Sequence, residues 1–262
     1  MPPRSRVLHI GIVSCACLLA MSLIVMWILR ARTTAQVTQC RNNLRIVAQA
    51  LCNYADMNND AFPSGTVANS TLPPPERISY LFSTLPFIDN FPAWKYVDRK
   101  ESWRSTSNAP FLDVEMPFYL CPAGRETMAE GFAVTHFIGC AGVGRDVSMV
   151  ESASDPRVGS FGYDRVVHRT DITDGLASTF LLIETTSHLG PWAAGGTSTI
   201  RPFDPGKVPY FGLAAPFGSF HASGKVNASF ADGSVRSLSR SMDAVVLEAM
   251  ATIAGGEEFP EW

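Results

Sequence analysis

The sequence predicts an α+β fold in which a long N-terminal helix, membrane-spanning in its first half, packs on an antiparallel β-sheet body with a short C-terminal helix. Three observations predict it: an uncharged apolar run at Val7–Leu29, a helical apolar stripe directly after it, and a loop-rich remainder with short strand patterns. We expect a membrane anchor over residues 1–30 and one domain over residues 31–262.

The chain is poor in charge, and the shortage is uneven. Of its 262 residues, 46% are hydrophobic and 17% are charged, against roughly 25% charged in an average soluble protein. Val7–Leu29 contains no Asp, Glu, Lys or Arg. The formal net charge of −3 excludes the basic face of a nucleic-acid-binding protein. We therefore expect no nucleic-acid partner, and we do not expect a free cytosolic protein.

The run Val7–Leu29 is long enough to cross a bilayer. As a helix it would reach about 34 Å, more than the roughly 30 Å of a hydrocarbon core. It exceeds the roughly 7–15 residues of the apolar part of a signal peptide, and only a poor cleavage site follows it. A lipoprotein would turn polar after Cys15, whereas this run continues apolar. We expect an uncleaved anchor in membrane lipid. Arginines flank the run on both sides, so charge leaves its orientation open.

The apolar pattern becomes helical after the run, over residues 31–58. Its apolar residues lie three or four positions apart, and they are Val37, Cys40, Leu44, Val47, Leu51, Tyr54 and Met57. No Pro or Gly interrupts this stretch. We therefore expect one helix that continues out of the membrane and lies on a folded body. The alternative is a coiled-coil stalk, which Cys40 and Tyr54 fit poorly as seam residues.

Short strands and turns characterise the β body, residues 59–240. Apolar runs predict strands at Pro117–Leu120, Phe132–Phe137 and Phe180–Ile183. Alternation on both sides of Asp232-Gly233 predicts a two-residue hairpin over Val226–Arg236, with both turn residues at positive φ. An apolar face over residues 241–254, followed by Gly255-Gly256, predicts the C-terminal helix.

Four cysteines lie outside the apolar run: Cys40, Cys52, Cys121 and Cys140. On a continuous helix Cys40 and Cys52 are about 18 Å apart, beyond the roughly 7 Å that a disulfide allows between Cα atoms. Disulfides would therefore join Cys40 or Cys52 to Cys121 or Cys140. Four such cysteines favour an oxidising compartment and place the body outside the cytoplasm. The alternative is buried free thiols.

The sequence offers no strong catalytic or metal-binding motif. The body contains no CxxC or HxxxH spacing, so zinc is a poor explanation of its cysteines. His221 with Asp232 could act as a general base, and Glu184 with His188 and His221 could bind a metal. No nucleophile elbow or phosphate-binding loop accompanies them. Because its turn explains Asp232, we expect His221 to brace the hairpin. We expect no enzyme, cofactor or metal.

Several motifs, in order along the chain, resemble the bacterial prepilin-like domain-of-unknown-function family with a C-terminal H-x9-DG signature. They include QCRNNLR at Gln39–Arg45, Cys121-Pro122, ITDG at Ile172–Gly175, and DGSVR at Asp232–Arg236. The signature residues, for which a structural role is expected, are Asn43, Leu44, Asp174, Gly175, Glu184, His221, Asp232 and Gly233.

The resemblance implies a pilin-like helix in the cytoplasmic membrane, a single pass with the N-terminus inside, and an extracytoplasmic body. It implies pilin-like, secretion-system or other envelope components as partners, and it supplies no biochemical activity, since none is established for the family. Two departures stand out: ten residues, not nine, separate His221 from Asp232, and Val7–Leu29 lacks the acidic residue of a prepilin span. We expect a structural or interaction role. The alternative is a membrane-tethered glycan- or peptide-binding module that uses Trp94, Trp103 and Trp192, and an enzyme is a third hypothesis.

Overall fold

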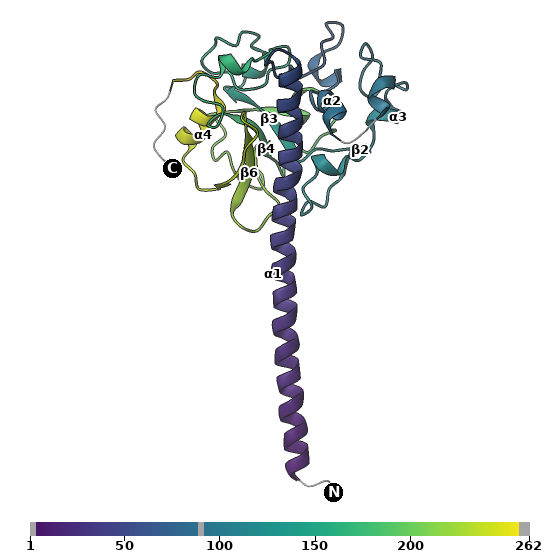
Figure 1. Ribbon diagram of the computed structural model, residues 1–262, viewed down its shortest axis with the longest axis vertical. Coiled ribbons are helices and arrows are strands. Elements are labelled where there is room, and N and C mark those ends of the chain that lie inside the picture. The colour runs from purple at the N-terminus through teal and green to yellow at the C-terminus, as the bar shows by residue number, and fades with distance from the viewer. Residues whose placement is uncertain (1–3, 89–91, 257–262) are drawn as a thin grey trace.

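One unbroken helix organises the molecule. The computed structural model describes residues 4–88 and 92–256, and its helix α1 runs over Arg4–Met57 for 54 residues. The first half of α1 projects from the body, and the second half packs against it (Figure 1). From Ile12 onward, α1 is long and apolar enough to cross a membrane. The prediction of a single long N-terminal helix is therefore confirmed.

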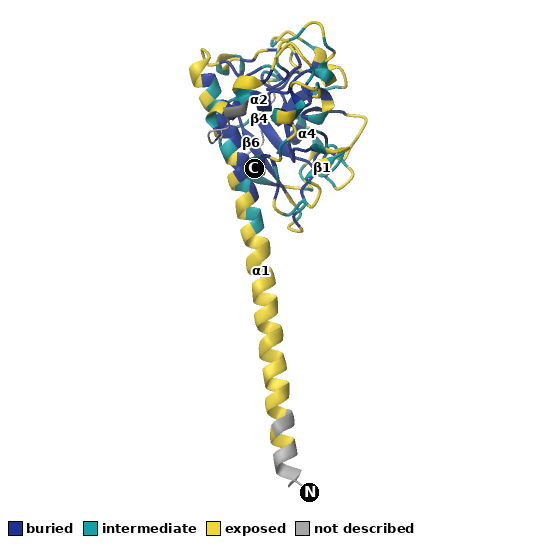
Figure 2. Ribbon diagram, turned by 90° about the vertical axis from the view of Figure 1, so that its right-hand side faces the viewer, coloured by how far each residue is buried: buried dark blue, intermediate teal, exposed yellow. Residues whose placement is uncertain are grey.

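The projecting half of α1 has no protein contacts to bury its apolar side chains. Every side chain from Ile12 to Ala35 is exposed (Figure 2). Trp27, the largest of them, is 77% exposed. A soluble protein does not leave so large an apolar surface in water, so this surface fits a lipid environment.

The second half of α1 buries most of the predicted stripe. Cys40, Leu44, Val47 and Leu51 are completely buried. Met57 was predicted to join them but is 75% exposed. At about 100° per residue, the two three-residue steps after Leu51 turn Met57 roughly 120° away from the packed face. Ala55, four residues after Leu51, takes the buried position instead.

A five-stranded mixed sheet forms the body, in the order β5-β3-β4-β6-β7. The strands are β3 Phe137–Val143, β4 Phe180–Glu184, β5 Ile200–Phe203, β6 Lys225–Phe230 and β7 Val235–Ser239. All neighbours are antiparallel except β3 and β5, which are parallel. Strands β1 (Met128–Ala129) and β2 (Phe132–Ala133) form a separate two-stranded sheet. The α+β fold is confirmed, with one parallel pair in a sheet that was predicted to be antiparallel.

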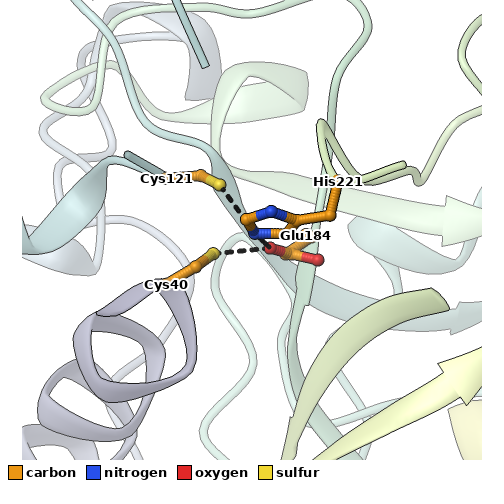
Figure 3. Close-up of side chains that lie close together, drawn as sticks. All are labelled: Cys40, Cys121, Glu184 and His221. Atoms are coloured by element: carbon orange, nitrogen blue, oxygen red, sulfur yellow. Dashed lines mark hydrogen bonds and ion pairs between the residues drawn. The ribbon is translucent and has the colours of Figure 1, made fainter. Parts of the chain in front are cut away.

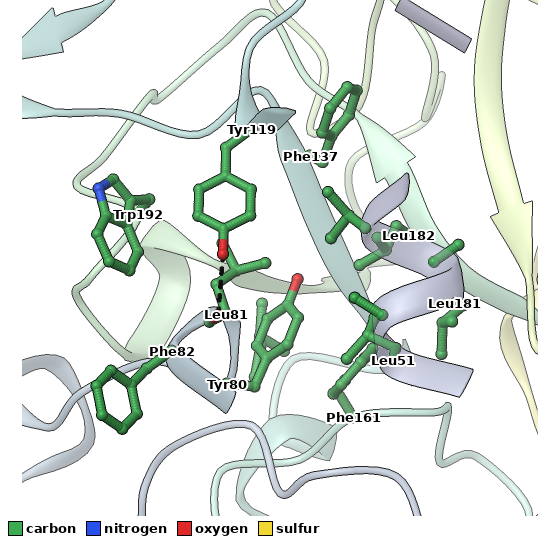
Figure 4. Close-up of a cluster of buried hydrophobic side chains, with 14 of the residues drawn as sticks. Leu51, Tyr80, Leu81, Phe82, Tyr119, Phe137, Phe161, Leu181, Leu182 and Trp192 are labelled. Carbon is green, nitrogen blue, oxygen red and sulfur yellow. Dashed lines mark hydrogen bonds between the residues drawn. The ribbon is translucent and has the colours of Figure 1, made fainter. Parts of the chain in front are cut away.

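Two apolar clusters lie on opposite faces of the sheet. The cluster on the α1 face contains Leu51, Phe137 and Leu182 (Figure 4). The other contains Ile138 and side chains of the C-terminal helix α4, Ala244–Ala251. Neighbouring residues of β3 thus alternate between two cores, as a covered sheet requires. In β4, Leu181 and Leu182 both belong to the α1-face cluster, where the pairing with β6 is irregular.

Helix α4 is shorter than the predicted residues 241–254. The Asp243 carboxylate accepts a hydrogen bond from the Val245 N–H (2.9 Å) and so caps its N-terminus. Thr252 is extended and ends the helix before Gly255.

Short helical segments make up much of the remaining body. The α-helical ones are α2 Leu81–Thr84 and α3 Ala109–Leu112. The described 3-10 segments are η1 Pro74–Glu76, η2 Leu85–Phe87, η3 Pro92–Tyr96, η4 Pro117–Tyr119, η5 Val147–Met149, η6 Arg169–Asp171 and η7 Gly196–Ser198.

Two strand predictions need correction, and one is confirmed. The predicted strand at Pro117–Leu120 is wrong, because proline suits the first position of the helical turn η4 and cannot donate to a strand ladder. The predicted strand Phe132–Phe137 divides between β2 and the start of β3. The strand at Phe180–Ile183 is confirmed as β4.

The hairpin lies where it was predicted, but its turn is longer by one residue. The Phe230 N–H donates to the Ser234 carbonyl (3.0 Å), and the Gly233 N–H donates to the Phe230 carbonyl (2.9 Å). The loop is therefore Ala231-Asp232-Gly233, with only Gly233 at positive φ (81°). This is the three-residue hairpin in which a left-handed glycine follows a normal turn.

Truncation of Leu51 tests the packing of α1 on the sheet. Leu51→Ala is expected to lower the free energy of unfolding by about 2–5 kcal/mol, because it leaves a cavity in a fully buried position. Met57→Ala, on the same helix but exposed, is the control and should change stability by less than about 0.5 kcal/mol. Equal losses in a denaturant titration would contradict this packing.

Candidate functional site

Four side chains from distant parts of the chain meet beneath α1. Cys40 comes from α1, Cys121 from the loop after η4, Glu184 from the end of β4, and His221 from the loop before β6 (Figure 3). Their donor atoms all lie within 4.8 Å of one another. None of the four is more than 5% exposed. The helix and the sheet therefore share one buried polar cluster.

Direct contacts link the four side chains. The Cys40 thiol donates to Glu184 Oε1 (2.6 Å), and Cys121 Sγ lies 3.2 Å from His221 Nε2. The same His221 nitrogen lies 3.8 Å from Glu184 Oε1. The Glu184 carboxylate thus contacts the Cys40 sulfur, and the His221 imidazole contacts the Cys121 sulfur (Figure 3).

A second set of contacts holds these groups in place. The Asn227 N–H of β6 donates to Glu184 Oε2 (2.7 Å). The Cys121 N–H donates to His136 Nδ1 (2.9 Å). Asn43 on α1 donates to the carbonyls of Pro117 and Leu120, just before Cys121. Backbone and side-chain contacts therefore fix the cluster from several directions.

The two thiols of the cluster have pKa values shifted in opposite directions. The neighbouring Cys40 thiol, and after it His221, lower the pKa of Cys121 to about 5 although burial opposes this. The nearby Cys121 sulfur, burial and the charge of Glu184 raise the pKa of Cys40. Burial raises the pKa of Glu184. For His221, burial opposes the charged form, but the contact with Cys121 outweighs it and raises the pKa. Cys121 and His221 therefore resemble a thiolate–imidazolium pair.

The burial of the cluster limits its chemistry. Reactive cysteines are partly exposed so that a substrate can reach the thiolate, whereas Cys121 is 2% exposed and Cys40 is completely buried. Two thiols, an imidazole and a carboxylate are, however, all ligands of thiophilic metal ions. The arrangement suits ion binding or a closed hydrogen-bond network better than catalysis.

A family comparison bears directly on this site. A family model described as "Protein of unknown function (DUF1559)" matches residues 30–207, well over half of the chain. The chain belongs to this family. The DUF1559 match includes Cys40, Cys121 and Glu184 and stops before His221. No curated protein and no solved structure matches the chain.

The DUF1559 match also limits what the resemblance supports. The family is one of unknown function, so its description assigns no activity. The H-x9-DG motif, here His221 to Gly233, lies beyond the matched residues. The prepilin-like character therefore belongs to the proposal below.

The predicted disulfides are wrong for the described residues of this DUF1559 protein, where all six cysteines are free. Cys40 and Cys121 do approach each other, but their sulfur atoms contact Glu184 and His221 instead. Cys52 donates to the Ala231 carbonyl (3.8 Å), and Cys140 donates to the Ala251 carbonyl (3.6 Å). These two thiols lie against different elements, the hairpin turn and α4, so neither faces another thiol.

Other signature residues of the DUF1559 protein have structural positions. Leu44 is part of the core. The Asp174 carboxylate accepts hydrogen bonds from the N–H groups of Gly255 (2.8 Å) and Gly256 (3.1 Å), which fastens the segment after α4. Gly175 has φ +101°, a conformation that favours glycine.

Neither alternative set is brought together whole: Glu184 and His221 of the metal set meet in the cluster, but His188 does not join them. Asp232 accepts from the Ser234 N–H (2.8 Å) in its own turn, while His221 lies against Cys121 and Glu184. His188 is exposed, whereas Glu184 is buried. His221 therefore does not brace the hairpin as expected, because the buried cluster holds its imidazole.

The three tryptophans suggested as ligand contacts differ in how far they are buried. Trp192 is completely buried and Trp103 is 8% exposed, so both belong to the core. Trp94 is half-buried and, with Tyr54 and Arg99, lines a cavity of about 580 Å³ near the end of α1. Only Trp94 remains available to a ligand.

Proposed function

We propose that this protein is a membrane-anchored, pilin- or pseudopilin-like extracytoplasmic protein with a structural or interaction role at the cell envelope, rather than an enzyme. One observation carries the proposal: the exposed apolar half of α1 and its buried half form one unbroken helix. The same helix that would lie in lipid is thus a core element of the body. This is the architecture that the prepilin-like resemblance implies.

The composition of the span favours an anchor over a fibre subunit. Val7–Leu29 contains no acidic residue, whereas in pilins a glutamate near the start of the span is thought to help dock the subunit into the fibre. A protein without that acidic residue still has the membrane helix and the body that the helix holds outside the membrane. The proposed partners are therefore pilin-like, secretion-system or other envelope components that contact the body.

Membrane fractionation tests this proposal. The full chain is expected in the membrane pellet after an alkaline wash, with the body digested by protease added outside spheroplasts and protected in inverted vesicles. Leu18→Arg with Leu19→Arg should release it, because each arginine costs about 2.5–3.5 kcal/mol in the centre of a span. Leu213→Arg, at a position 68% exposed on the body, is the matched control.

Two outcomes would contradict the proposal. One is a wild-type chain that remains soluble, and the other is a body protected from protease in spheroplasts. The tethered glycan- or peptide-binding alternative depends on the cavity beside Trp94. Quenching of tryptophan fluorescence by cell-wall oligosaccharides or peptides, abolished by Trp94→Ala, would favour that alternative.

A further inference from the structure

We propose that Cys40, Cys121, Glu184 and His221 bind one Zn²⁺ ion that fastens α1 to the sheet. Thiolate sulfur, imidazole nitrogen and carboxylate oxygen are the three ligand types that zinc takes in proteins. Structural zinc sites are closed, with four protein ligands and no open position. Four ligand side chains, all buried, match that class in number and in access.

Two donor spacings in the cluster are close to those of a tetrahedral ion, and no spacing exceeds 4.8 Å. Ligands at about 2.0–2.3 Å from a tetrahedral zinc are roughly 3.3–3.8 Å apart. Cys121 Sγ and His221 Nε2 are 3.2 Å apart, and His221 Nε2 and Glu184 Oε1 are 3.8 Å apart. Cys40 Sγ lies closer to Glu184 Oε1, at 2.6 Å, because its thiol donates a hydrogen bond there. Loss of that proton removes the hydrogen bond and lets both atoms turn toward an ion.

Charge provides the second argument. A buried carboxylate beside two thiols is costly without a cation. When Zn²⁺ binds, two protons leave to solvent, one from the Cys40 thiol and one that Cys121 and His221 share, so that both sulfur atoms are thiolates and His221 coordinates through a neutral Nε2. Two thiolates and one carboxylate then bring three negative charges to the ion, so the site carries one net negative charge. Because the cluster carries the same net charge before binding, the ion offsets the negative charges that the departing protons leave behind.

The surrounding contacts match those of a metal site. The Asn227 N–H donates a hydrogen bond to Glu184 Oε2. The other carboxylate oxygen, Oε1, then faces the cluster and can act as a single ligand atom. His136 accepts from the Cys121 N–H and fixes the loop that carries this cysteine. Such outer contacts orient ligands, and their loss typically lowers metal affinity by about 10–100-fold.

The ion would join α1 to three separate segments of the body. Cys40 is the α1 ligand, and the other three follow it over more than half of the chain. The site would therefore stiffen the junction between anchor and body. The zinc site does not depend on the proposed membrane-anchored role, so a failure of one proposal leaves the other intact.

Metal analysis of the full-length protein in detergent tests the site. We expect about one zinc ion per chain by mass spectrometry of the metal content. After chelation, added Co²⁺ should give the intense absorption of thiolate–cobalt bonds together with tetrahedral ligand-field bands. Cys121→Ser and His221→Ala should each weaken zinc binding at least 10-fold. Cys52→Ser, a half-buried cysteine outside the cluster, is the matched control and should bind normally.

Several results would overturn the proposal. They are an apoprotein that takes up no zinc or cobalt, copper or iron bound in place of zinc, zinc retained undiminished by both cluster variants, and a Cys40–Cys121 disulfide in non-reducing peptide maps. The cobalt spectrum is recorded on the wild-type chain, so the test stands even where a cluster variant fails to fold.

Discussion

Arg165→Met is expected to lower the free energy of unfolding by about 4 kcal/mol or more. Arg165 is 1% exposed, and burial lowers its pKa to about 10, so it stays protonated at neutral pH. Its guanidinium donates to five backbone carbonyls from three segments of the body, those of Ala141, Val147, Val150, Gly159 and Phe161. Methionine fills similar space but leaves the carbonyls of Val150, Gly159 and Phe161 without their donor, whereas those of Ala141 and Val147 keep a backbone N–H donor. Each unsatisfied buried group costs about 1–3 kcal/mol.

A matched arginine isolates this effect. Arg157 pairs with Asp146 and Asp155, but its side chain is 46% exposed. Exposed pairs contribute about 0–1 kcal/mol, so Arg157→Met should unfold near the wild-type denaturant concentration. Urea titration followed by tryptophan fluorescence compares the two variants. Similar midpoints for both would show that Arg165 does not hold these loops together.

Gly142→Ala is expected to cost about 2–5 kcal/mol, the sum of a left-handed backbone penalty and overpacking. Gly142 has φ +109°, and a Cβ there would lie 2.1 Å from the Arg157 carbonyl oxygen and 2.5 Å from the Gly159 nitrogen. Both neighbours are backbone atoms, which cannot turn aside as a side chain can. The close approach of two chain segments beside β3 therefore requires glycine.

Gly131→Ala separates the two causes. Gly131 also has positive φ (87°), but a Cβ there would meet nothing within 4 Å. Gly131→Ala should lower the free energy of unfolding only by the left-handed backbone penalty, about 1–2 kcal/mol. Thermal unfolding of the two variants gives the difference. If Gly131→Ala were as damaging as Gly142→Ala, the contact with Arg157 and Gly159 would not be the cause.

The parts of the fold that local patterns encode were predictable. The apolar run and the stripe through Leu44 and Leu51 predicted α1, and the alternation around Asp232-Gly233 predicted the hairpin. The parallel pairing of β3 with β5 was not, because it joins residues some sixty positions apart and no local periodicity records it. The predicted end of the stripe was wrong for another reason. Apolar spacing alone did not show that Ala55, and not Met57, would be buried.

The spacing of the four cluster residues along the sequence matches no known metal-binding motif. Metal motifs are recognised when two ligands lie close in sequence, as in CxxC, but here each ligand comes alone from a different segment. One signal was present: Glu184 directly follows the apolar strand Phe180–Ile183. A carboxylate at the end of a buried strand needs a partner. Cys40 with Cys121 was also expected as a possible disulfide and Glu184 with His221 as possible metal ligands, but nothing in the sequence joined the two pairs into one site.

In the membrane-anchored form that we propose, the continuity of α1 sets how the body is held above the bilayer. Only about 10 Å of helix separates Leu29 from Gln36, where the Gln36 side chain donates to the Pro122 carbonyl (3.2 Å). That gap is little more than one layer of lipid headgroups. With no hinge in between, the body must lean as the span leans, through the roughly 20° tilt common for such helices. The contacts that set the tilt of the span would then also set how far the body leans toward the membrane surface.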